Sequence, residues 1–471
     1  MSGPMRFERA TVFDGTAEEL GAWHFRRGAV QRLIPPWERI EVLREASPLV
    51  NGAVAEFRIR KGPLSLPIVA VHEKVDPPRR FVDRLTRGPF RSWRHEHTFE
   101  PCAVGATLRD AIAFDAPLGA VGRVFLGGTL RREIARQFAF RHERTRADLA
   151  RHAEICARFG ERTLRVGVTG ANGLVGRQLC AFLSTGGHSV VRFVRGAAKG
   201  ADERPWNPND PESGLDPAHL ADLDAVVHLA GAGIADRRWS EARKREIRES
   251  RTLGTATVAR ALARAGARPS VLVSASAIGF YGARGDDPVD ERTGAGTGFL
   301  PDVVQAWEDA TVAARDAGVR VVHARFGVVL SAAGGALGKM VGPFLFGAGG
   351  PVGNGRQGFS WISLDDLLGA TLFALRNDAL RGPVNFVSPL PLAQRGFAKV
   401  LGRVLRRPAF APLPAFVVRA MFGEMGQRLL LEGAFVRPAA LESQGFRFEH
   451  ASLERALRLE LGRLEQTEAL P

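Results

Sequence analysis

The pattern of apolar and polar residues changes about a third of the way along the chain. In the first part, residues 54–60 (VAEFRIR) and the surroundings of residues 111–114 alternate apolar and polar side chains, which indicates strands with one buried face. Between residues 129 and 159 proline is absent and apolar residues recur at roughly helical spacing. The pattern therefore predicts strands over about residues 5–130, followed by one long amphipathic helix that packs on the sheet.

After a short joint at residues 160–163 (GERT), the pattern becomes strand, glycine turn and helix, and this unit repeats. Such a repeat is typical of a parallel sheet with helices on both faces. We therefore expect three parts: residues 1–160 as an N-terminal domain, residues 164–375 as a Rossmann domain, and residues 376–471 as a C-terminal lobe that is intertwined with the Rossmann domain.

A glycine-rich loop follows the first strand of the second part. Residues 164–169 (LRVGVT) read as a buried strand, and the next seven residues are Gly170, Ala171, Asn172, Gly173, Leu174, Val175 and Gly176. One glycine lets the chain turn tightly, one lets the backbone approach a pyrophosphate, and one lets the following helix pack closely on the strand. The position between a strand and a helix predicts a dinucleotide site, with the phosphates at the helix N-terminus.

The end of the second strand indicates which dinucleotide binds. Residues 189–194 (SVVRFV) end at Val194, and Arg195 follows, with no carboxylate before Asp202. An NAD enzyme would place Asp or Glu here, whereas an arginine can pair with the 2′-phosphate of NADP. We therefore predict NADP(H) as the cofactor, with a solvated surface arginine as the alternative for Arg195.

Further cofactor contacts are expected at the ends of later strands and on the helix after the third core strand. Residues 224–231 (DAVVHLAG) end in small residues that leave room for the adenosine. The arginine-rich helix that follows either folds back over the dinucleotide or has a charged face exposed to solvent. The additional candidates are Leu229, Ala230, Gly231, Glu246, Arg251, Ser274 and Val329.

Longer motifs carry two family resemblances. TGANGLVG, ARFGVVLSAAGGAL and LLLEGAFVRPAALESQGF resemble the epimerase-like atypical branch of the short-chain dehydrogenases, the NAD-dependent epimerase/dehydratase type with a C-terminal domain of unknown function. The resemblance covers about residues 164–462 and implies an extended Rossmann fold, a doubly wound parallel α/β sheet that binds NADP(H). Upstream, HTFEPCAVGATLRDAIAFDAPLG and FAFRHER resemble the START-like, polyketide-cyclase-type family, which implies an α+β helix-grip domain. Its interior either binds an apolar ligand or packs solid.

The usual proton-transfer pair of short-chain dehydrogenases is absent. Relatives carry Tyr-x-x-x-Lys on a helix, where the lysine lowers the pKa of the tyrosine. Tyr281 is the single tyrosine of this chain, and Gly285 stands four residues later. Val304 and Glu308 occupy the positions where the pair would lie, and neither can replace it.

Other side chains are therefore considered for catalysis and substrate binding. Ser276 ends a core strand and is a candidate to bond the reacting oxygen, or an ordinary strand-end hydroxyl. Tyr281 is a substitute proton donor, a pocket-lining aromatic residue or plain packing. Glu308 is an acid/base if buried, or else a helix-surface carboxylate. Arg325 either holds an anionic substrate group or forms a structural ion pair, and Trp361 is a second substrate candidate.

Composition narrows the function classes. The 471 residues carry a formal net charge of +15, but arginines are spread singly among acids, so binding to nucleic acid or to an anionic membrane is not favoured. The three cysteines show no metal-ligand spacing, no metal is predicted, and neither a signal segment nor a membrane span is visible, so a cytoplasmic location is expected. Two functions remain: an NADP-dependent oxidoreductase or epimerase-like enzyme with a small-molecule substrate, or an NADP(H)-binding sensor without turnover. The oligomeric state stays open.

Overall fold

The computed structural model describes residues 4–117, 119–266 and 268–464. They form two compact units. The first comprises the described residues of Met1–Glu154, Ala181–Gly187 and Arg458–Pro471, and the second comprises those of Ile155–Cys180 and His188–Leu457. The division at Glu154 falls inside a helix that ends at Phe159, just before residues 160–163.

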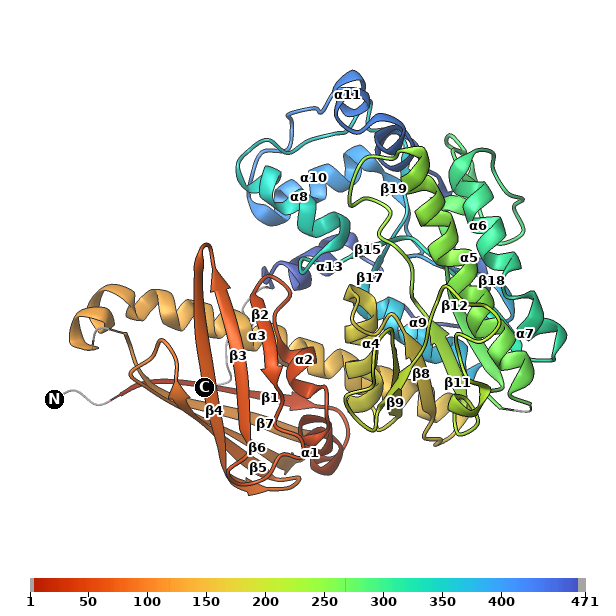
Figure 1. The fold of residues 1–471 in the computed structure, drawn as a ribbon. Coiled ribbons are helices and arrows are strands. Elements are labelled where there is room, and N and C mark those ends of the chain that lie inside the picture. The colour runs from red at the N-terminus through yellow and green to blue at the C-terminus, as the bar shows by residue number, and fades with distance from the viewer. Residues whose placement is uncertain (1–3, 118, 267, 465–471) are drawn as a thin grey trace. The chain divides into compact units, whose positions relative to one another are not determined.

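The first unit is built on a seven-stranded antiparallel sheet (Figure 1). Its strand order is β1-β7-β6-β5-β4-β3-β2. In β7 every second residue is buried, which is the alternation expected for a strand with one covered face. The strands are β1 (Met5–Phe13), β2 (Arg39–Arg44), β3 (Val54–Lys61), β4 (Leu64–Asp76), β5 (Arg80–Arg87), β6 (Ser92–Cys102) and β7 (Gly105–Asp115).

Three helices accompany this sheet: α1 (Ala17–Phe25), α2 (Ala29–Leu33) and the long α3 (Gly119–Phe159). Thr16 and Glu19 form a capping box that starts α1. Ile134 and Phe138 of α3 pack with Ile112 of β7 in one apolar cluster, so the helix covers part of the sheet as predicted.

Two details of the predicted N-terminal pattern are wrong. The sheet ends at Asp115 and α3 begins at Gly119, ten residues before the predicted start, because residues 119–128 contain four glycines that weaken the helical signal. The prediction also placed only strands before residue 130, whereas α1 and α2 lie between β1 and β2.

The second unit contains a seven-stranded parallel sheet of order β10-β9-β8-β11-β12-β14-β18. The predicted parallel Rossmann sheet is thus confirmed. Helices lie on both of its faces, with α5, α6 and α7 on one and α4 and α9 on the other (Figure 1). The strands are β8 (Arg165–Thr169), β9 (Ser189–Val194), β10 (Glu203–Pro205), β11 (Ala225–His228), β12 (Val271–Ala277), β14 (Arg320–Phe326) and β18 (Gly382–Phe386), and the helices are α4 (Leu174–Thr185), α5 (Glu241–Arg264), α6 (Phe299–Asp309), α7 (Val312–Asp316) and α9 (Leu364–Arg376).

The remaining segments of the second unit form short sheets and helices beyond the main sheet. β20 (Phe435–Val436) pairs with β13 (Pro288–Val289), and β19 (Leu392–Ala393) pairs with β16 (Gly358–Phe359), so C-terminal segments add to earlier ones. The other elements are β15 (Val328–Leu330), β17 (Trp361–Ser363), α8 (Gly335–Leu345), α10 (Gln394–Leu405), α11 (Ala415–Gly426), α12 (Ala439–Ser443) and α13 (Leu453–Glu460).

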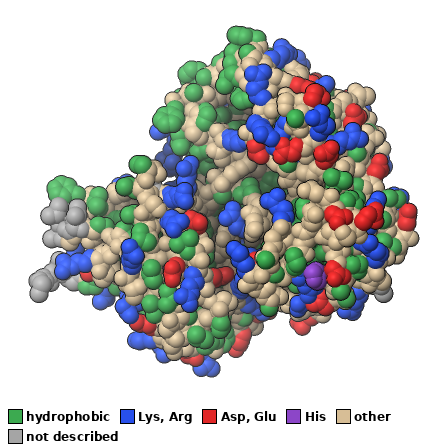
Figure 2. Space-filling view, viewed as in Figure 1, with side chains coloured by type: hydrophobic (Ala, Val, Ile, Leu, Met, Phe, Trp, Pro, Cys, Tyr) green, Lys and Arg blue, Asp and Glu red, His purple; other side chains and the backbone are tan. Residues whose placement is uncertain are grey.

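Two surface properties bear on the function classes. Lys and Arg side chains are interspersed with acidic ones over the face shown in Figure 2, as the scattered sequence positions predict. None of the helices in the described part of the chain is both long enough and apolar enough to cross a membrane.

Candidate functional site: the edge of the parallel sheet

The glycine-rich loop lies where the strand order of the parallel sheet reverses. The chain runs from β8 to β9 on one side of the sheet, whereas β11 pairs with β8 on the other side, so the carboxyl ends of β8 and β11 border a topological switch point. Gly170 adopts φ +67°, and a Cβ at this position would lie 2.8 Å from the carbonyl carbon of Leu229. Only glycine allows the loop to pass this close to the backbone that follows β11.

The other two glycines have separate reasons. A Cβ at Gly176 would lie 2.2 Å from the carbonyl oxygen of Gly170, so α4 packs against the loop as closely as glycine permits. A Cβ at Gly173 would meet that same oxygen at 3.2 Å, and the Gly173 amide donates to it at 2.9 Å. The first amide groups of α4 have no acceptor within the helix, so they are free to bind phosphate oxygens.

A buried threonine–histidine pair fixes the strand ends beneath this loop. Thr169 Oγ1 accepts from the Leu229 amide at 3.1 Å and lies 2.8 Å from His228 Nδ1. Complete burial lowers the pKa of His228 to about 4, so the imidazole of this hydrogen-bonded pair is neutral near pH 7. Sequence reasoning missed this pair, although two polar residues that end adjacent buried strands were a usable signal.

Arg251 supplies a cation next to the site. It lies on α5, its guanidinium carbon is 5.0 Å from the centre of the Trp307 ring, and a Cβ at Gly231 would be 3.6 Å from its Cγ. Burial, with a contribution from Arg243, lowers the pKa of Arg251 to about 10. Its hydrogen bond runs to the carbonyl of Ile247, and no carboxylate of the described residues pairs with it. Such a guanidinium is suited to a phosphate group.

Arg195 is exposed directly after β9, as a partner of a 2′-phosphate should be. In the described part of the chain it forms no ion pair, whereas the nearby Arg192 pairs with Asp202 and Glu203. Glu246 is less suited to the cofactor than expected, since Arg237 and Arg243 each hold it at 2.7 Å.

The three catalytic candidates lie in one hydrogen-bonded network at the ends of β12 and β14. Ser276, which pairs with Arg325 across the two strands, donates its hydroxyl to Glu308 Oε1 at 2.6 Å. Arg325 donates to both oxygens of Glu308 at 2.8 Å each. Glu308 is therefore the acceptor at the centre of the network rather than a free surface carboxylate.

Tyr281 completes this network from the loop after β12. Its hydroxyl donates to Asn385 Oδ1 at 2.8 Å and accepts from Arg325 Nη1 at 3.1 Å. The side chain is fully buried, and burial is the main cause that raises the pKa of Tyr281. Arg325 also lies 3.5 Å over the ring of Phe280. The sequence left two roles open for Arg325, binding of an anionic substrate group or a structural ion pair. In the structure its Nε and Nη2 donate to Glu308 and its Nη1 donates to Tyr281.

The other predicted residues line the core near the same sheet edge. Ser274 is 1% exposed inside β12, and Trp361 is completely buried in β17. Val329 lies in β15, and a Cβ at Gly335, just after that strand, would be 3.6 Å from the Leu174 side chain at the start of α4. Asp365 lies in the first turn of α9 after the Ser363 cap, where a carboxylate suits the helix dipole.

Taken together, these residues fit a phosphate-bearing dinucleotide. A Cβ at Gly173 would lie only 3.2 Å from the Gly170 carbonyl oxygen in the loop before α4, and two arginines without acidic partners among the described residues stand near the ends of β9 and β11. When bound, NADPH would donate a hydride from C4 of its nicotinamide, and NADP+ would accept one at the same atom.

Comparison with known proteins agrees with this geometry. Residues 166–387 match the NAD dependent epimerase/dehydratase family, and residues 413–459 match a domain of unknown function, DUF1731. The epimerase family protein Mb2239 of Mycobacterium bovis is 45% identical over 292 residues, which are 62% of this chain and 96% of that protein. A homologous protein of Arabidopsis thaliana, described as chloroplastic, is 36% identical over 64% of this chain and 88% of its own length.

Two solved structures are also similar. A nucleoside-diphosphate sugar epimerase from Corynebacterium glutamicum superposes with a TM-score of 0.82 and 31% identity over 98% of this chain and 91% of that chain, so the match includes the N-terminal unit. Human epimerase family protein SDR39U1, solved with NADPH, matches 64% of this chain and 100% of its own with 34% identity and a TM-score of 0.59. The NADP(H) prediction is therefore confirmed for a relative in this family. The chain belongs to the NAD dependent epimerase/dehydratase family.

Proposed function

We propose that this protein is an NADP(H)-dependent oxidoreductase or epimerase-like enzyme that acts on a small molecule. The observation that carries the proposal is the glycine loop at the switch point, where a Cβ at Gly170 or Gly176 would clash with backbone atoms and α4 begins directly after Gly173. A diphosphate bound against the amide groups at the start of α4 would account for this loop. The NADPH complex of human SDR39U1 supports the choice of cofactor, and the exposed Arg195 supports a contact with the 2′-phosphate.

The proton path of the proposed reaction uses Ser276 and Glu308 instead of the missing Tyr-x-x-x-Lys pair. Ser276 already donates to Glu308, so a substrate hydroxyl could pass its proton to the serine oxygen while the serine proton moves to the carboxylate. In the opposite direction the same two protons return to the substrate oxygen. Arg325 holds Glu308 in place through two bonds, and Tyr281 orients Arg325, so we assign these two residues to positioning.

A second candidate function has an observation in its favour. Ser276, Glu308, Arg325 and Tyr281 satisfy one another's hydrogen bonds, and a structural network of this kind needs no substrate. A non-catalytic NADP(H) sensor would retain the nucleotide loop and this network while lacking turnover.

We also propose that the N-terminal unit has a START-like, helix-grip fold. Support comes from its antiparallel sheet with a long helix after the last strand. We propose no apolar ligand for it, because the inner face carries a group of buried histidine and aspartate side chains: His72, His95, His97, Asp110 and His142.

The test begins with calorimetric titration of NADPH. Gly173→Val should lower NADPH affinity at least tenfold while the circular dichroism spectrum stays unchanged. Gly342→Val is the matched control, since a Cβ at that position in α8 meets nothing within 4 Å. Equal NADPH affinity in wild type and Gly173→Val would refute the site.

Turnover separates the two functions. Purified protein is incubated with NADPH and a panel of carbonyl compounds, and the nicotinamide absorbance is followed. If the wild type consumes NADPH and the variants Ser276→Ala and Glu308→Gln do not, the result supports an enzyme with the proposed proton path. Tight NADPH binding without consumption over a broad panel supports the sensor.

A further inference from the structure

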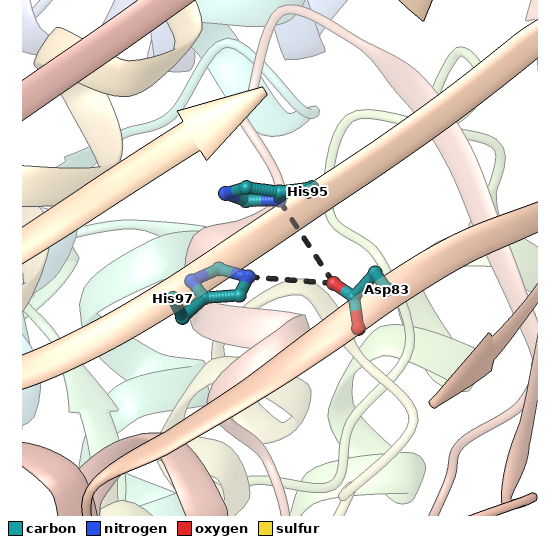
Figure 3. A group of neighbouring side chains, drawn as sticks. All are labelled: Asp83, His95 and His97. Carbon is teal, nitrogen blue, oxygen red and sulfur yellow. Dashed lines mark hydrogen bonds and ion pairs between the residues drawn. The ribbon is translucent and has the colours of Figure 1, made fainter. Parts of the chain in front are cut away.

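The N-terminal unit contains three side chains with the donor set and spacing of a metal site. Asp83 lies on β5, and His95 and His97 lie two residues apart on the neighbouring β6, so both imidazoles point to the same face of the sheet. Asp83 is directly opposite His95 in the strand pairing. One ligand atom from each residue lies within 4.8 Å of the other two (Figure 3).

Their geometry resembles that of a metal site. Asp83 Oδ2 is 3.3 Å from His97 Nε2 and 3.9 Å from His95 Nδ1. Two ligands of a tetrahedral zinc ion, each at about 2.0–2.1 Å from the metal, lie about 3.3–3.5 Å apart. One contact thus already has the required length, and the other needs a small ring movement. Two histidines and one carboxylate leave further coordination positions open.

A surrounding shell of carboxylate and histidine groups orients these three side chains. His95 Nε2 and His97 Nδ1, the nitrogens that face away from Asp83 Oδ2, each lie 2.8 Å from Asp110 Oδ1. His142 on α3 holds the second Asp110 oxygen at 2.5 Å. Metal-ligating histidines ordinarily present their second nitrogen to such a carboxylate, which fixes the tautomer and the ring direction.

A histidine also holds the second oxygen of Asp83, and aromatic rings flank the two histidine ligands, while the Asp83 side chain itself is 25% exposed. Asp83 Oδ1 lies 3.0 Å from His72 Nε2, and His72 Nδ1 bonds the Ala53 carbonyl at 3.1 Å. The Phe81 ring stacks on His97 with centroids 4.2 Å apart, and Phe138 meets His95 edge-on at 5.2 Å. These rings fix the direction of the two imidazoles and limit solvent access to them.

We propose that the N-terminal unit binds one divalent first-row transition-metal ion, such as Zn²⁺, through Asp83, His95 and His97. Asp110 and His72 are positioning residues for these ligands. Imidazole and carboxylate ligands together suit zinc, iron and cobalt ions rather than calcium or magnesium. The proposal does not depend on the nucleotide site, which lies in the other unit. The sequence did not predict this site, because a His-x-His pair on a strand lacks the cysteine spacing of common zinc motifs.

The experiment uses the tag-free full chain after treatment with a chelator. Zn²⁺ is titrated by calorimetry, and bound zinc is counted by mass spectrometry after gel filtration. Co²⁺ is then added as a spectroscopic probe, because its visible bands differ between aqueous six-coordinate ions and ions with four or five ligands. We expect one equivalent of Zn²⁺ per chain and a low-coordinate Co²⁺ spectrum that Zn²⁺ abolishes.

Variants locate the ion. His95→Gln and His97→Gln should each weaken Zn²⁺ binding at least 100-fold, and Asp110→Asn should weaken it about 10- to 100-fold. His219→Gln, outside this cluster, is the matched control and should bind like the wild type. Circular dichroism and NADPH affinity report whether each variant is folded.

Two results would overturn the proposal without reliance on any variant. One is less than a tenth of an equivalent of zinc on the wild-type chain at 100-fold excess, and the other is a Co²⁺ spectrum identical to that of the free aqueous ion. Equal zinc content in His97→Gln and His219→Gln would overturn it too, because the ion would then bind elsewhere.

Discussion

Arg325 holds both carboxylate oxygens of Glu308, with Nε and Nη2 each 2.8 Å from one oxygen. The side chains are 3% and 11% exposed, respectively, so the pair is largely shielded from water. From the sequence, we expect Glu308 at the position where short-chain dehydrogenases with Tyr-x-x-x-Lys carry the lysine. The cation next to this carboxylate comes from the strand β14.

Glu308→Gln should destabilise the protein because it leaves the Arg325 guanidinium buried without a compensating charge. Breaking a buried ion pair from one side costs about 3–5 kcal/mol. Ser276→Ala removes a single hydrogen bond to the same carboxylate and should cost about 1–2 kcal/mol. Urea unfolding followed by fluorescence measures both values. A Glu308→Gln variant as stable as the wild type would show that the pair is solvated.

Tyr281→Phe tests whether the buried tyrosine acts as a positioning residue. The substitution removes a hydroxyl that bonds Asn385 and Arg325, and we expect the free energy of unfolding to fall by about 1–2 kcal/mol. NADPH affinity should stay within twofold of wild type. Once a substrate is known, turnover should fall much less in Tyr281→Phe than in Ser276→Ala. The reverse order would make Tyr281 the proton donor.

Arg195→Ala should change the preference between the two dinucleotides. A charge-assisted bond to the 2′-phosphate contributes about 1.5 kcal/mol or more, so NADPH affinity should fall about tenfold or more. NADH affinity should not change, because NADH lacks that phosphate. Arg292→Ala is a suitable control, since the Arg292 side chain is 90% exposed and pairs with Asp290. Equal losses for both dinucleotides would assign Arg195 to another role.

His228 makes a specific contribution to the pH dependence of stability. Its pKa in the folded protein is about 4, below the usual 6.5, because burial disfavours the charged imidazole. As the pH falls below 6.5, the unfolded chain takes up this proton and the folded chain does not, so stability falls until the pH reaches about 4. A shift of this size corresponds to about 3 kcal/mol.

The variant His228→Asn checks this assignment, because it removes the titrating group and keeps a polar side chain, able to donate or to accept, near the Thr169 hydroxyl. Unfolding free energies are measured for both proteins at intervals from pH 7.5 to 4. The wild type should lose about 2–3 kcal/mol more than the variant between pH 6.5 and 4. Parallel curves would mean that His228 titrates normally.

The amino-acid sequence alone determined the parallel sheet, the glycine loop and the absence of Tyr-x-x-x-Lys. These features are local: a strand followed by a glycine turn and a helix needs only neighbouring residues to be recognised, and a missing residue type can be read directly. The sequence also named Ser276, Tyr281, Glu308 and Arg325 as candidate site residues, each with a structural alternative.

Only the tertiary structure decided which side chains meet. Glu308 and Arg325 are 17 residues apart, and Tyr281 meets Asn385 across 104 residues, so no sequence pattern shows that they share hydrogen bonds. Asp83, His95 and His97 likewise come together only through the pairing of β5 with β6. Side-chain contacts depend on strand register and helix packing, and these are set by the whole core rather than by any single segment.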